Sequence, residues 1–222
     1  MSSKKIPIQL PKYTLGEEIG NSITHGIGAA LSIAGCVMAI IFAALYGDAW
    51  CVVSACIYGA TLIIAYITST LYHALTHVTA KKVFRVLDHT NIFLLIAGTY
   101  TPMTLVVLRG PLGWVLFGIV WGAAVVGIVL NAVGLERFKT FSMIAYIASG
   151  WAALIGIVPL YRLMDHVGFW MVVGGGIAYT LGVIFFSLKQ RYMHVVWHVF
   201  VIAGSLLHYF AVLFYVLPID RL

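Results

Sequence analysis

The chain has 222 residues, of which 62% are hydrophobic and only 9% are charged. Because a soluble domain has about 25% charged residues, this composition excludes an ordinary soluble protein and predicts an integral membrane protein. The net charge of +6 comes without a basic stripe interleaved with aromatic residues, which argues against a nucleic-acid partner and favours positively charged cytoplasmic loops. The cysteines have no paired metal-ligand spacing and are expected to be packing residues: Cys36, Cys51 and Cys56.

Seven apolar runs follow one another along the chain, and each is close to the ~20 residues that a spanning helix needs. They cover about residues 23–46, 50–72, 92–108, 114–133, 141–161, 169–188 and 193–217. The sixth run contains Gly174–Gly176, which suits close helix contact. The N-terminus lacks the apolar core of a signal peptide, so the first span is expected to direct targeting. We therefore predict an all-α, seven-transmembrane-helix bundle over residues 22–218, with an N-terminal segment 1–21 and a short tail 219–222.

Lysine and arginine distribution predicts the orientation of this bundle. If the runs alternate across the membrane, one side holds ten basic residues: Lys4, Lys5, Lys12, Lys81, Lys82, Arg85, Arg137, Lys139, Lys189 and Arg191. The opposite side holds only Arg109, Arg162 and Arg221. Because basic residues accumulate on the cytoplasmic side, the N-terminus is expected inside and the C-terminus outside.

Histidines gather at the predicted cytoplasmic ends of these spans. In the last run His194 and His198 are four residues apart, which places both imidazoles on one helix face, one turn apart. His73 ends the second run, and Ser69 precedes it by one turn. Asp88 precedes the third run. Six of the eight histidines fall near this membrane face: His25, His73, His77, His89, His194 and His198.

Polar side chains of this kind are expensive inside a membrane and mark functional sites. Three protein ligands with one open position are typical of a catalytic zinc site, and His73, His194 and His198 are the candidate ligands. Asp88 could accept a proton from water made acidic by the metal, and Ser69 could orient that water or a substrate carbonyl. Imidazole suits several divalent metals, so the spacing does not select Zn2+ alone.

Each residue has a structural alternative. His194 and His198 could form interhelical hydrogen bonds without a metal, and His73 could be an interfacial histidine beside a loop. Asp88 could be the N-cap of the third helix. His208 lies ~15 Å deeper than His198 at 1.5 Å per residue, so it is expected to be a buried hydrogen-bonding residue, or alternatively to touch a substrate. The others are expected in exposed loops or at helix interfaces: His77, His89 and His166.

Four ordered motifs resemble those of the haemolysin III family, which belongs with the progestin and adipoQ receptors and more distantly resembles the alkaline ceramidases. They are Glu18 to His25, Ser69 to His73, Leu87 to Ile92 and His194 to His198, and the resemblance extends from about residue 17 to 215. It implies a seven-helix bundle with a cytoplasmic-side zinc held by the three histidines, with Asp88 and Ser69 holding water at the metal. The short N-terminus and the absence of a large soluble extension are typical of bacterial members rather than of an animal receptor, so a protein of the bacterial inner membrane is expected.

The resemblance favours a zinc-dependent hydrolase of a lipid amide or ester, linked to membrane lipid homeostasis. The alternative is a non-catalytic sensor of lipid state or membrane fluidity with a structural zinc. A haemolysin or channel is disfavoured because the spans lack a repeated polar face. A di-iron desaturase is disfavoured because the chain has no adjacent histidine pair. Membrane lipid is the expected substrate or ligand, and the sequence does not predict an oligomeric state.

Overall fold

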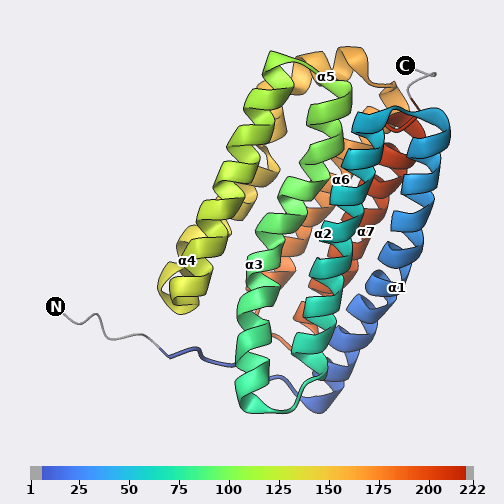
Figure 1. Cartoon of the computed structure of the whole chain (residues 1–222). Coiled ribbons are helices and arrows are strands. Elements are labelled where there is room, and N and C mark those ends of the chain that lie inside the picture. Colours follow the sequence, from blue (N-terminus) through green and yellow to red (C-terminus); the bar gives the residue numbers. More distant parts are fainter. Residues whose placement is uncertain (1–6, 219–222) are drawn as a thin grey trace.

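A computed structural model describes residues 7–218 and shows a bundle of long helices (Figure 1). The elements in order are α1 (Leu15–Tyr46), α2 (Ala49–Ala74), α3 (Val78–Pro102), η1 (Met103–Val107), α4 (Pro111–Gly150), η2 (Ala152–Gly156), α5 (Ile157–Leu163), α6 (His166–Ser187) and α7 (Met193–Tyr215). Large apolar side chains cover the outside of the helices, as a lipid-facing surface requires. The prediction of an all-α membrane protein is confirmed, whereas Lys4, Lys5, Arg221 and the tail 219–222 lie outside the described residues.

The first helix begins earlier than the apolar run alone predicts. Thr14 caps α1 through a capping box, in which the Thr14 hydroxyl accepts from the Glu17 backbone N–H and the Glu17 carboxylate accepts from the Thr14 backbone N–H. Helix formation therefore starts at Leu15, eight residues before the predicted span. These additional turns of α1 place polar side chains at one end of the bundle, beside the candidate metal centre described below.

The third helix also starts earlier than predicted, at Val78, where His77 is the N-cap and its ring accepts from the Ala80 backbone N–H. Asp88 is therefore in the interior of α3, and the alternative reading of Asp88 as the N-cap is wrong. His77 is exposed as expected, but its role is that of a cap rather than of a loop residue. Pro102 ends α3 and the chain continues as the π-helix η1, because proline has no N–H to continue the α-helical ladder.

The fourth helix doubles back on itself at Gly134, which has non-helical backbone angles. The Ser142 hydroxyl donates to Asn131 Oδ1 at 2.6 Å, although eleven residues of straight helix would separate them by about 16 Å. Tyr146 also accepts a hydrogen bond from Asn131, and Figure 1 shows the two arms side by side. Residues 135–139, which lie between the fourth and fifth predicted spans, are therefore helical and follow the turn at Gly134.

Six helical stretches of the described chain are long and apolar enough to span a membrane. The fourth stretch, Pro111–Leu163, has 53 residues and contains the turn at Gly134. At 1.5 Å per residue it would be about 80 Å long if straight, more than twice the ~30 Å hydrocarbon core. The predicted count of seven spans therefore depends on counting the two arms of this stretch separately.

Glycine allows close contact at two helix pairs. A Cβ added at Gly28 of α1 would lie 2.6 Å from the Tyr66 ring of α2. Gly175, in the triple-glycine segment of α6, lies against His208 of α7, where an added Cβ would be 2.5 Å from the imidazole. The predicted close packing at this glycine segment is thus present, between α6 and α7.

An apolar cavity of ≈ 180 Å³ lies between α3 and α4 on one side and α6 and α7 on the other. Its wall is almost entirely apolar, with Ile92 and Met103 from α3 and η1, and Val201 from α7. Tyr179 and His208 contribute polar groups within that wall. Its shape and lining suit a hydrocarbon chain better than water or ions.

Candidate metal centre

Three histidines from two helices meet at the end of the bundle where α1 begins. His73 comes from the last turn of α2, and His194 and His198 come from the first two turns of α7. Each offers one ring nitrogen, and these three nitrogens lie within 4.8 Å of one another. His73 and His198 are only 2% and 1% exposed, and His194 is half-buried. The three predicted ligands are therefore brought together, and as a group they could hold a metal ion.

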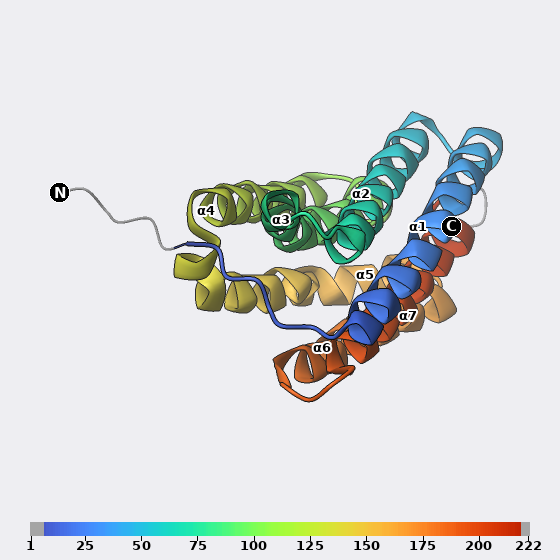
Figure 2. The same ribbon diagram turned by 90° about the horizontal axis from the view of Figure 1, so that it is seen from below.

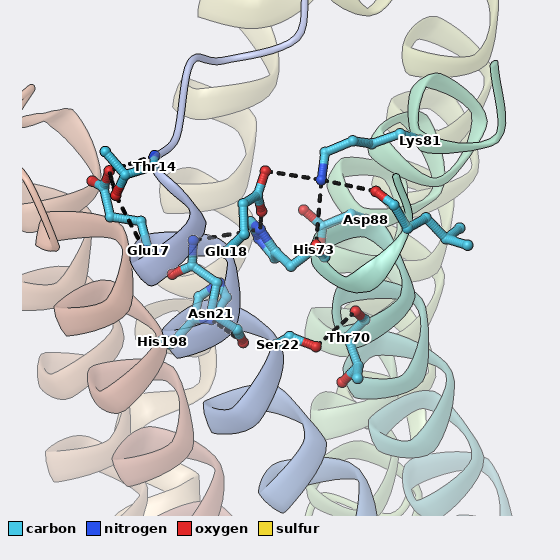
Figure 3. Close-up of polar contacts among 12 residues, drawn as sticks. Thr14, Glu17, Glu18, Asn21, Ser22, Thr70, His73, Lys81, Asp88 and His198 are labelled. Atoms are coloured by element: carbon cyan, nitrogen blue, oxygen red, sulfur yellow. Dashed lines mark hydrogen bonds and ion pairs between the residues drawn. The ribbon is translucent and has the colours of Figure 1, made fainter. Parts of the chain in front are cut away.

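Helix α1 fixes the orientation of His73. His73 Nδ1 donates to the Glu18 carboxylate at 2.7 Å, and the Asn21 side chain lies 3.4 Å from the same nitrogen (Figure 3). Because a carboxylate accepts, Nδ1 carries the proton and Nε2 presents its lone pair. That Nε2 atom is buried without a hydrogen-bond partner among the described residues. A carboxylate behind a histidine is the usual outer support of a metal ligand.

The same helix orients His198. His198 Nδ1 donates to the backbone carbonyl of Asn21 at 3.2 Å and lies 3.1 Å from the Thr24 hydroxyl. The Thr24 hydroxyl itself donates to the Gly20 carbonyl, so it accepts from the imidazole. His194 Nε2 is also buried and without a partner in the described part of the chain. In this donor set His73 and His198 have outer partners on Nδ1, and His73 and His194 have unpartnered Nε2 atoms. Such a group of imidazoles fits a divalent metal such as zinc.

A network of charged residues surrounds the Glu18 carboxylate. Lys81 of α3 forms an ion pair with Glu18 at 2.8 Å and donates to the backbone carbonyl of His73 at 3.3 Å (Figure 3). Arg85, one turn further along α3, forms an ion pair with Glu136 of α4. These contacts tie α1, α2, α3 and α4 together beside the three histidines.

Asp88 and Ser69 occupy the same end of the bundle. Ser69 is 2% exposed, precedes His73 by one turn of α2, and its hydroxyl has no partner among the described residues. Asp88 projects from α3 in the view of Figure 3, and burial together with the charge of Asp88 raises the pKa of Tyr13. Tyr13 in turn contacts His73 and His194 through its ring. Asp88 therefore lies at the histidine end of α3, and no hydrogen bond joins it to the three candidate ligands in the described part of the chain.

Three other histidines lie within the bundle and are not among the candidate ligands. His25 of α1 stacks flat on His198, with ring centroids 3.4 Å apart and an interplanar angle of 12°. His89 donates to the Arg85 carbonyl within its own helix and approaches Phe186 of α6. His208 Nε2 donates to the Val172 carbonyl at 2.9 Å, so its prediction as a buried hydrogen-bonding residue is confirmed.

The sequence did not predict a role at the metal centre for the residues that surround the candidate ligands: Tyr13, Glu18, Asn21, Thr24 and Lys81. The spacing of Glu18, Asn21 and His25 would have signalled them, because steps of three and four residues place all three on one helix face. Glu18 and Asn21 lie before the predicted apolar run, which began at about residue 23, so that run did not include them, although both belong to the first of the four ordered motifs. Tyr13 precedes the helix, so no periodic pattern includes it.

Together the fold and this site define a multi-pass helical membrane protein with a candidate metal centre at one end of the bundle. A protein-family model described as "Haemolysin-III related" matches residues 13–209. The chain therefore belongs to the haemolysin III family.

Named relatives agree with this assignment. The chain is 47% identical over 203 residues to "Hemolysin-3" of Bacillus cereus, covering 91% of this chain and 93% of that protein. It is 44% identical over 211 residues to "Hemolysin-3 homolog" of Bacillus subtilis (strain 168), covering 95% and 99%. It is also 28% identical over 208 residues to the human "Monocyte to macrophage differentiation factor", covering 90% and 85%. The distant human likeness supports the wider progestin and adipoQ receptor superfamily.

Proposed function

We propose that this protein is a zinc-dependent, membrane-embedded hydrolase of a lipid amide or ester. The observation that carries the proposal is the group of three imidazoles, whose ligand nitrogens lie within 4.8 Å of one another beside an apolar cavity. Ile92 lines that cavity one turn from Asp88, and Val201 lines it three residues from His198. A lipid chain in the cavity would thus bring its head to the histidines, after entering sideways between helices.

The proposed reaction divides its tasks among named side chains. A zinc ion bound by the three histidines would polarise a carbonyl oxygen and make water more acidic. Asp88 would accept the proton of the attacking water and deliver it to the leaving nitrogen or oxygen. Ser69 would donate a hydrogen bond to the water or to the substrate carbonyl. Glu18 and Asn21 would hold the ligand histidines in the required tautomers.

The topology we propose is a seven-span bundle, in which the two arms of α4 with η2 and α5 are two crossings. The N-terminus would be cytoplasmic and the C-terminus outside, and the membrane would be the bacterial inner membrane. Lysine and arginine support this orientation, because Lys81 and Arg85 lie at the histidine end whereas Arg109 and Arg162 lie toward the opposite end. The site would then face the cytoplasmic leaflet.

The names of two relatives suggest one other function, and the position of the triad suggests a second. Two relatives are called haemolysins, but the almost wholly apolar cavity of this chain offers no polar lining for conduction, so we do not propose a channel. A non-catalytic sensor of lipid state is a second candidate. The three histidines come from α2 and α7, so a metal bound there would hold these two helices together without taking part in a reaction. The resemblance to alkaline ceramidases supports the hydrolase instead.

The test begins with metal content, by elemental analysis of protein purified without a histidine tag. Wild type should contain about one zinc per chain, and His73→Ala should contain none. Fatty acid release from N-acylsphingosine and from a phospholipid is then compared between wild type, Asp88→Asn and the control Asp165→Asn, which changes only the cap of α6. Asp88→Asn should retain zinc and fold but lose about 10²-fold or more in rate.

Three possible results of these measurements distinguish the hydrolase, the sensor and the role of Asp88. A wild type without stoichiometric metal contradicts the hydrolase and the zinc sensor together. Zinc that is present, lost in His73→Ala and accompanied by no lipid turnover favours the sensor. Turnover that is equal in wild type and Asp88→Asn removes Asp88 from the proposed chemistry.

A further inference from the structure

The segment of residues 7–14, which we call the N-terminal strap, crosses the end of the bundle that carries the histidines (Figure 2). It has no regular secondary structure, so specific contacts must hold it in place. The Gln9 backbone N–H donates to Glu136 Oε1 at 3.1 Å, and Glu136 is in turn paired with Arg85. One end of the strap is thereby attached to the turn of α4.

The other end of the strap is attached to α1 and α7. Thr14 and Glu17 form the capping box, and the second Glu17 oxygen accepts from the Tyr192 backbone N–H at 3.0 Å. Tyr192 precedes α7 by one residue and has a left-handed backbone with φ of 64°. The strap therefore bridges the gap between α4 and α7, which are two of the helices that border the cavity.

Tyr13 places an aromatic ring over the histidines from this strap. Its centroid lies 5.2 Å from the ring of His194 and 5.7 Å from that of His73. His194 is the least buried of the three candidate ligands, and its ring also approaches that of Phe186, with centroids 5.7 Å apart. Tyr13 thus covers the two histidines that lie nearest to the aqueous face.

We propose that Tyr13 is a specificity-determining residue that closes the histidine site to water-soluble molecules. Ligands then reach the histidines from the apolar cavity, and soluble reagents and metal ions enter only when the strap lifts. This inference uses the proposed function in taking the three histidines as the working site. The barrier itself is a property of the protein with or without a metal.

The test measures the rate at which diethyl pyrocarbonate carbethoxylates His194, followed by peptide mass spectrometry. Protein is purified in chelator, so that a bound metal does not itself shield the imidazole. His77, which is exposed at the same end of the bundle, is the internal reference. In wild type His194 should react at least about tenfold more slowly than His77, because modification must wait for local opening.

Two pairs of variants test whether the strap limits the modification of His194. Tyr13→Ala should accelerate His194 modification about tenfold or more, whereas Tyr13→Phe, which keeps the ring, should behave as wild type. Gln9→Pro removes the N–H that binds Glu136 and should also accelerate it, whereas Gln9→Ala keeps that N–H and should not. His77 should react at the same rate in all four variants. Tyr46→Ala, at the far end of α1, controls for general loosening of the bundle.

A second readout is the rate of zinc removal by excess soluble chelator, which should rise in Tyr13→Ala with the initial zinc content unchanged. The inference is overturned if His194 reacts as fast as His77 in wild type, or if Tyr13→Ala and Gln9→Pro leave its rate unchanged. A wild type without zinc contradicts the proposed function, but the carbethoxylation rates still decide the role of Tyr13.

Discussion

The contact between Glu18 and His73 allows a quantitative test of the metal centre. The carboxylate accepts from Nδ1 at 2.7 Å, and the two side chains are 18% and 0% exposed. Removing an outer partner of this kind lowers metal affinity by about 10- to 100-fold, which is about 1.4 to 2.8 kcal/mol. Glu18→Gln keeps an acceptor and loses only the charge, so a loss of about tenfold is expected. Glu18→Ala loses both, and its effect should approach 100-fold.

The assay is a competition titration of zinc between the purified protein and a chelating dye. Glu17→Gln is the matched control, because Glu17 is adjacent but binds Thr14 and Tyr192 rather than a histidine. It should lower thermal stability through the weakened cap, by about 1 kcal/mol, without changing zinc affinity. A folded Glu18→Ala variant with wild-type affinity would refute the reasoning, because Glu18 would then have no part in orienting the ligand.

Three further predictions concern stability. Gly28→Ala should destabilise the bundle by about 1–3 kcal/mol in thermal denaturation, because its methyl group would collide with the Tyr66 ring; an unchanged melting temperature would contradict that packing. Asn131→Ala should destabilise by about 1–3 kcal/mol, since its amide joins the two arms of α4; no change would mean that the turn is held otherwise. Partial burial raises the pKa of Asp48, but hydrogen bonds and the Arg109 charge outweigh it and hold that pKa below 3.8. The ionised carboxylate therefore stabilises the fold above about pH 4, and this stabilisation is lost as pH falls through the lower folded pKa. The loss of folding stability on acidification should be smaller in Asp48→Asn than in wild type, by no more than about 1 kcal/mol.

The apolar runs were enough to predict most of the bundle, because the bilayer imposes a length and a composition on each span. They misplaced the starts of α1 and α3 because a hydropathy rule detects the membrane-embedded part of a helix and not its polar extension. Capping by Thr14 and His77 determines those starts. The turn at Gly134 falls in the gap between the fourth and fifth predicted runs, but apolar runs alone do not reveal that the charged residues after Gly134 are helical.

The grouping of the three ligand candidates was also predicted from sequence, because spacing and span ends placed His73, His194 and His198 at one membrane face. The roles of Glu18 and Asn21 could not be derived in the same way. Their contacts join residues 52 to 177 positions apart, and they depend on how α1 packs between α2 and α7. Only the packed bundle reveals which polar side chain supports which imidazole.

The same long separations have a consequence for biosynthesis. Thr24 and His198 are 174 residues apart, and Glu17 and Tyr192 are 175 residues apart. At 5–20 residues per second a ribosome reaches α7 roughly 10 to 35 s after it completes the start of α1. Asn21 therefore waits in the nascent chain without His198, and the candidate metal centre is complete only after the last helix is inserted. A chain that stops before α7 keeps those polar groups unpaired in the bilayer and is less stable than the finished protein.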